Sequence, residues 1–207
     1  MSEATACGPL PLWPFQTAEQ VRAWQVHRQT LGGDPQHRLD PASTALEFTR
    51  GALGLTAVDR VTSRKVAGDG CLVGVGWLGE GGVELTVGVL RLVRFGEGGA
   101  SAPWAVAGTV DTAAFTRPAY GATVTAPLQV AGVIDGVDET LRVMVIGPGG
   151  RILGRAGPIG VGGSDQRWEA AVELAPAPSG SVLTVVVCTG GHLGDVEWFA
   201  VTGVRLA

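Results

Sequence analysis

The chain of 207 residues has 16% charged and 45% hydrophobic residues, a composition that argues against extensive disorder and suits one large domain or two small ones. Its formal net charge is −4 and no basic stripe is present, which excludes nucleic-acid binding through clustered lysine and arginine. Glycine accounts for 33 residues and stands between β-branched runs, where it marks the turns and bulges of a mostly β protein.

The N-terminus carries part of a lipoprotein signal. Residues 4–8 resemble the small-residue site where bacterial lipoproteins are cleaved before a lipidated cysteine, here Cys7, but no hydrophobic region precedes them. We expect either that the signal peptide is missing from this chain and Cys7 carries a lipid anchor, or that Cys7 is an ordinary thiol in a tail. No apolar run in the sequence reaches the length of a transmembrane segment.

Two helices are predicted near the start of an α+β domain spanning residues 10–111. Thr17 and Gln20 form a capping box, and Val21 and Trp24 follow on the inner face of that helix. Asp40-Pro41 begins the second helix with an acidic cap and proline at the first helical position. Its inner stripe consists of Ala42, Ala45, Leu46, Thr49 and Leu53.

Four strands follow at residues 59–66, 71–78, 83–95 and 104–109. They predict an antiparallel meander with the helices on one face, a topology similar to that of cystatin-like and NTF2-like folds. The expected inward residues are Val73, Val75, Trp77, Leu85, Val87 and Val89. Some folds of this kind hold a ligand between sheet and helix, and a pocket here would be lined by Trp24 and Trp77.

Residues 112–207 predict an immunoglobulin-like β-sandwich, because short strands recur with turn signals between them and no helical stripe appears. The strands are placed at residues 123–125, 128–134, 140–146, 151–157, 167–174, 181–188 and 196–206. Cys188 lies in one of these strands and Cys71 in the first domain. We expect both to be buried as small hydrophobic residues.

Residues 118–132, the glycine turn at 147–150 and Pro178-Ser-Gly180 resemble the immunoglobulin-like domain of bacterial spore-germination proteins. That domain also occurs in secreted proteins and lipoproteins of Gram-positive bacteria, actinobacteria among them. The resemblance covers roughly the last 90 residues and implies an extracytoplasmic location and no catalytic residues.

Three loops are expected to share one end of this sandwich. Their polar residues are Asp135, Asp138, Glu139, Asp165, His192 and Asp195. These side chains are either ordinary solvated loop residues or a site for Ca²⁺, a basic partner or a sugar. Ca²⁺ requires about six to eight oxygen ligands, and the sequence has no D-x-D-x-D calcium loop.

The sequence has no nucleophile, phosphate-binding or zinc-ligand motif. We therefore expect a non-catalytic, extracytoplasmic binding or assembly protein of a bacterial cell envelope, without cofactor or metal, whose partner is an envelope protein or a glycan. The alternatives are a small-molecule binder or enzyme with its pocket in the first domain, and a purely structural spacer.

Overall fold

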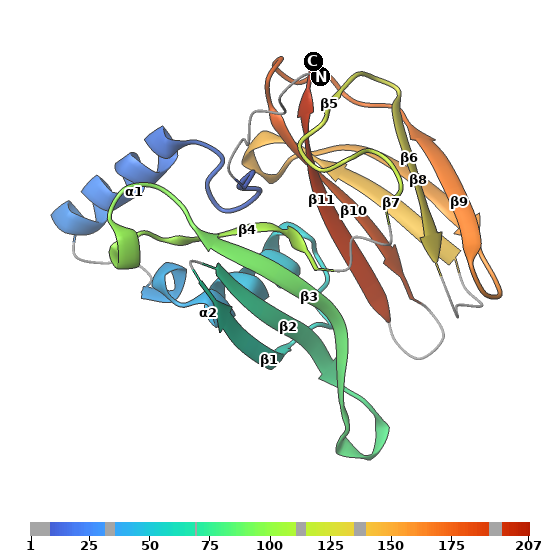
Figure 1. Cartoon of the computed structure of the whole chain (residues 1–207), viewed down its shortest axis with the longest axis horizontal. Helices are drawn as coiled ribbons and strands as arrows, with labels where there is room; N and C mark the ends of the chain where they lie inside the picture. Colours follow the sequence, from blue (N-terminus) through green and yellow to red (C-terminus); the bar gives the residue numbers. More distant parts are fainter. Residues whose placement is uncertain (1–8, 32–35, 69, 111–114, 135–139, 191–195) are drawn as a thin grey trace.

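The structure is a computed structural model that describes residues 9–31, 36–68, 70–110, 115–134, 140–190 and 196–207. The protein is mostly β, with two α-helices and three sheets in the described part of the chain (Figure 1). Neither helix there combines the length and apolar character needed to cross a bilayer. Cys7 lies outside the described residues.

The first sheet is an antiparallel meander in the order β1-β2-β3-β4, as predicted. Its strands are β1 (Arg60–Ala67), β2 (Gly70–Leu78), β3 (Glu84–Arg94) and β4 (Trp104–Thr109). The core face of this sheet carries Cys71, Val73, Leu90, Leu92 and Val106, all buried.

Both helix starts confirm the caps expected from the sequence. Before α1 (Ala18–Leu31), the Gln20 amide donates to Thr17 Oγ1 and the Thr17 amide to Gln20 Oε1, each at 3.2 Å. At α2 (Pro41–Glu47), Asp40 Oδ2 accepts from the Ser43 amide at 2.9 Å. A π-helical turn, Phe48–Ala52, extends α2.

Only α2 packs on the face of the sheet, whereas the sequence predicted both helices there. α2 packs against all four strands, and its own residue Ala45 is fully buried. α1 lies apart from α2 and packs on the β3–β4 connection (Figure 1). There, a Cβ added at Gly96 would lie 2.6 Å from Val21 Cγ1, and Gln25 Nε2 donates to Glu97 O at 3.1 Å.

The predicted inner face of β3 is partly wrong, because the strand contains a bulge. Val75 pairs with Gly88 and Gly76 pairs with Thr86, so one residue of β3 is skipped and its alternation is reset. As a result Val87, Leu90 and Leu92 are buried on β3, whereas Leu85 is exposed and Val89 is only half-buried.

The second part contains two sheets around a second core. A five-stranded sheet has the order β5-β11-β10-β7-β8, and a two-stranded sheet pairs β6 with β9. The strands are β5 (Thr123–Val124), β6 (Leu128–Ile134), β7 (Thr140–Ile146), β8 (Ile152–Gly160), β9 (Gln166–Val172), β10 (Val182–Thr189) and β11 (Trp198–Leu206). Each overlaps a predicted strand. β5 runs parallel to β11, and the other pairs are antiparallel.

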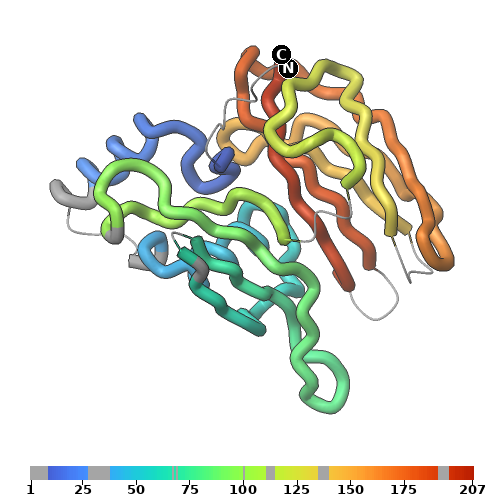
Figure 2. Tube along the Cα trace, in the orientation of Figure 1, coloured from blue at the N-terminus to red at the C-terminus, as the bar shows by residue number. Residues whose placement is uncertain are grey.

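One hydrophobic core joins the two parts. It contains Phe48 and Leu90 of the first part together with Ile146, Val186 and Phe199 of the second. β11 runs alongside β3 and β4 (Figure 2).

Hydrogen bonds and a close packing contact reinforce this junction. The Val201 amide donates to Thr109 Oγ1 at 3.0 Å. A Cβ added at Gly203 would lie 2.4 Å from Leu12 Cδ2, so the N-terminal segment packs directly on β11. The domain boundary predicted between residues 111 and 112 lies outside the described residues, and the core continues from one part to the other.

Candidate functional site

The strand ends flanking the three predicted loops lie together at one end of the second part. Ile134 pairs with Gln166, Thr140 with Gly160, and Leu141 with Thr189. Asp165 is exposed, with a φ of 52°. The remaining polar residues predicted here, Asp135, Asp138, Glu139, His192 and Asp195, lie outside the described residues.

The two tryptophans predicted to line a pocket pack in separate contacts. Trp24 lies against Phe15, with ring centroids 5.6 Å apart. Trp77 Nε1 donates to Val196 O at 3.0 Å, across the junction of the two parts. Neither residue lines the cavity at the junction of the two parts, the cavity beside β4 and β11, or the cavity over β6 and β9.

The cysteines of the two parts are both free thiols. Cys71 is buried and Cys188 is partly buried against the same core. Burial raises the pKa of the Cys188 thiol, and the nearby Arg142 offsets part of this effect. Cys188 therefore stays protonated and poorly nucleophilic at neutral pH.

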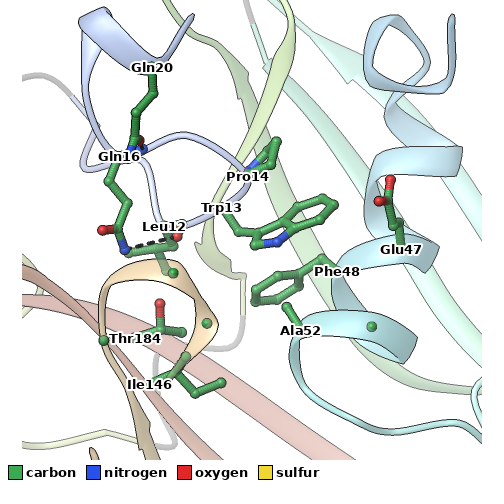
Figure 3. Close-up of a pocket in the computed structure, with 14 residues that line it drawn as sticks. Leu12, Trp13, Pro14, Gln16, Gln20, Glu47, Phe48, Ala52, Ile146 and Thr184 are labelled. Carbon is green, nitrogen blue, oxygen red and sulfur yellow. Dashed lines mark hydrogen bonds between the residues drawn. The ribbon is translucent and has the colours of Figure 1, made fainter. Parts of the chain in front are cut away.

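A cavity of about 430 Å³ lies where the two parts meet, and we call it the junction cleft (Figure 3). The N-terminal segment, the end of α2 with its π-helical turn, and the turn between β7 and β8 form its walls. The residues that line it include Trp13, Gln16, Glu47, Phe48, Gly51 and Thr184. Its volume falls in the range of small-molecule sites.

The aromatic side of the cleft is held by backbone pairing with β4. The Leu12 amide donates to Val106 O, and the Val106 amide to Trp13 O, each at 2.8 Å. This pairing fixes the Trp13 indole beside the Phe48 ring, with centroids 5.9 Å apart and planes inclined at 47°. The Arg38 guanidinium lies 5.5 Å from the centroid of the Trp13 ring.

Polar groups face the aromatic pair. Gln16 Nε2 donates to Leu12 O at 3.3 Å and to Val182 O at 3.2 Å, which orients the amide and leaves Gln16 Oε1 as an acceptor. Thr184 lines the opposite wall. The Glu47 carboxylate also lines the cleft, and its Oε1 lies 3.9 Å from Arg38 NH2.

The wall contributed by the second part is backbone, because the β7–β8 turn is Gly147-Pro148-Gly149-Gly150. The Gly150 amide donates to Gly147 O at 3.2 Å, and Gly149 has a φ of 70°. A Cβ at Gly147 would lie 2.6 Å from Leu153 Cδ1. This wall therefore offers main-chain groups to a ligand.

The lining of the cleft has few ionisable groups. Glu47 is the single ionisable side chain among its described lining residues, whereas acid–base catalysis usually needs further positioned groups. The described residues hold no group of three or more side chains suited to a metal ion. No family model, curated protein or solved structure matches this chain.

Segments that form this cleft were predicted from the sequence, but their proximity in the fold was not. The helix that begins at Asp40-Pro41 and the turn at 147–150 were each identified, and they lie far apart in the chain. A separate cavity, of about 640 Å³, lies over β6 and β9. It carries an exposed ion pair in which Arg117 NH2 is 2.8 Å from Glu169 Oε2.

Proposed function

We propose that this chain is a non-catalytic, extracytoplasmic binding protein of a bacterial cell envelope, and that its ligand occupies the junction cleft. The observation that carries this proposal is the construction of the cleft from both parts of the chain around one shared core. Such a site is preorganised, because its walls are fixed before a ligand arrives.

The order of the strands supports an immunoglobulin-like assignment for the second part. β6 and β9 pair on one side, with Arg117 bridged to Ala131 at the edge, while β7, β10 and β11 pair on the other. This is the distribution of the second and fifth strands against the third, sixth and seventh in such sandwiches. The resemblance of residues 118–132 to the spore-germination domain points the same way and supplies the extracytoplasmic location.

The lining of the cleft favours a hydroxyl-rich ligand such as an envelope glycan. Trp13 provides an aromatic surface that the buried Phe48 ring supports from behind, while Gln16, Glu47 and the glycine turn provide hydrogen-bonding groups beside it. Arg38 lies close to the Glu47 carboxylate, so the site carries little net charge. A neutral polar ligand matches this combination better than an ionic one.

A pair of glycine substitutions tests the proposal. Gly51 lines the cleft, and a Cβ added there meets no atom within 4 Å, so Gly51→Trp adds bulk at the cleft without a clash at its Cβ. Gly160→Trp is the matched control, because its Cβ also meets nothing within 4 Å and it lies beside the loop end of the second part. Binding of both variants and the wild type is measured on an array of envelope glycans.

The two variants separate the cleft from the loop end. We expect the wild type and Gly160→Trp to bind the same glycans and Gly51→Trp to lose them, with all three proteins melting at similar temperatures. Loss of binding in Gly160→Trp alone would place the site at the loops. If the wild type binds no glycan on the array, the ligand assignment is wrong.

A further inference from the structure

A second cavity, of about 450 Å³, lies between β4, β11 and residues 115–120. We call it the Arg91 groove. Many of the side chains that line it are apolar, among them Leu72, Ala107, Val110, Phe115 and Val201. Mostly apolar cavities of this size with a few placed polar groups are typical of small-molecule sites. None of these residues lines the junction cleft.

The groove is open because of a glycine in β4. Leu72 pairs with Arg91, and Arg91 with Gly108, so the three residues stand in a row across the sheet. Gly108 has a φ of 137°, and a Cβ there would lie 3.2 Å from Val201 O. Both the positive φ and the close approach to Val201 O disfavour a side chain at Gly108, so the space beside the Arg91 side chain stays free.

Among the described residues that line the groove, Arg91 is the one with a charged side chain. Its guanidinium lies 5.1 Å from the centroid of the Tyr120 ring, and NH2 donates to Ala107 O at 3.4 Å. Tyr120 is itself held in place, since its hydroxyl donates to Leu10 O at 3.0 Å and accepts from the Leu10 amide at 2.6 Å. The cation is thus fixed by ring and backbone.

No carboxylate among the described residues lies within salt-bridge distance of Arg91, and no other described lining residue is ionisable apart from Tyr120. A guanidinium has five N–H donors arranged to bind a carboxylate in a bidentate manner, and the bond to Ala107 O uses one of those of Arg91.

We propose that the Arg91 groove binds a small apolar carboxylate, with the carboxyl group on Arg91 and the hydrocarbon portion against Leu72, Phe115 and Val201. Complementarity of charge selects the carboxylate, and the apolar lining selects the remainder of the ligand. This site is independent of the junction cleft and of the ligand proposed for it.

The test uses octanoate, with octanamide as its neutral match and octylammonium as its cationic match. Each probe is titrated up to about 10 mM, a range that detects weak binding, into ¹⁵N-labelled protein while amide shifts are followed by NMR. We expect octanoate to shift the amides of Leu72, Thr109 and Val201 and to bind about tenfold more tightly than octanamide, as a charge-assisted bond implies.

Three variants locate the selectivity. Arg91→Gln is expected to abolish the preference for octanoate over octanamide, while Arg91→Lys keeps part of it because the charge remains. Arg155→Gln, an exposed arginine on β8, should behave as the wild type. The ratio of the two affinities is the readout, so a partial loss of folded protein does not alter it.

The following results would overturn the proposal. They are no binding of octanoate, equal binding of octanoate and octanamide by the wild type, an unchanged preference in Arg91→Gln, and shifts confined to residues outside the groove. Preferred binding of octylammonium would overturn it as well.

Discussion

Replacing Gly88 by alanine tests the joint between the two parts of the protein. Gly88 lies on β3 directly beneath the Phe199 ring of β11. A Cβ at this position would lie 2.5, 2.7 and 3.0 Å from ring atoms Cε1, Cζ and Cδ1 of Phe199. Ordinary contacts between carbon atoms are about 3.5–4.0 Å, so the ring would have to move by about 1 Å.

The size of the effect follows from two opposing contributions. Alanine in a strand is favoured over glycine by about 0.5–1 kcal/mol. Overpacking a buried site costs about 1–3 kcal/mol, and Phe199 is only 1% exposed within a closed core. We therefore expect Gly88→Ala to lower the free energy of unfolding by about 1–2 kcal/mol, or the melting temperature by about 2–8 °C.

Urea denaturation followed by tryptophan fluorescence measures this change, and a double-mutant cycle tests whether it arises from the contact with Phe199. Phe199→Leu removes ring atoms Cε1 and Cζ, so Gly88→Ala should cost about 1 kcal/mol less in that background. Gly160→Ala is the control, since its Cβ has open space, and should stay within about 0.5 kcal/mol of the wild type. A neutral or stabilising Gly88→Ala would refute the packing of β11 on β3.

Three further results are expected. Burial by itself raises the pKa of Asp40, but hydrogen bonds from the Ser43 amide and hydroxyl and the charge of Arg64 outweigh it and hold that pKa below its ordinary value. Asp40→Ala should therefore lower the free energy of unfolding by about 1 kcal/mol at pH 7. In urea titrations this difference should be present above about pH 4 and vanish as the pH falls through the lowered pKa of Asp40. A constant difference down to pH 2 would contradict the cap. Tyr120→Phe should lower the free energy of unfolding by about 1–2 kcal/mol, because both polar groups of Leu10 lose their partner, and an unchanged urea midpoint would show that these bonds contribute nothing. In a Cys7→Ser background, Cys188 should react with a disulfide reagent at pH 8 at least about tenfold more slowly than a free thiol, and reaction at the rate of free cysteine would contradict its burial.

Local sequence signals predicted the elements of this fold closely. The capping box at Thr17 and Gln20 and the Asp40-Pro41 start act within a few residues, so they could be identified from sequence alone. β4 (Trp104–Thr109), β6 and β7 match their predicted bounds, because turn residues flank each of these apolar runs.

Features that depend on long-range packing were not predictable in this way. The bulge at Val87 and Gly88 reset the inner face of β3, and nothing in the alternation of residues 83–95 signals it. α1 has an inner face, as expected, but which surface receives it depends on the β3–β4 connection around Gly96. The packing of Phe199 on Gly88 joins residues more than a hundred positions apart.

The candidate site was missed for the same reason. Trp13, Phe48 and Gly147 come from three distant segments, and no spacing rule connects them. The predicted loop end was correct in bringing its flanking strand ends together, because antiparallel pairing of neighbouring strands determines which connections share an end. Its polar residues remain a prediction, with Asp165 alone in the described part of the chain.

Mapping of amide shifts by NMR, with soluble fragments of cell-wall glycan as the probe, tests the central claim most directly. If the ligand occupies the junction cleft, saturable shifts will appear on both of its walls, at Gln16 and Ala52 on one side and at Gly149 and Thr184 on the other. Shifts confined to residues 159–166, or no saturable shift at any residue, would contradict the assignment of the cleft as the binding site.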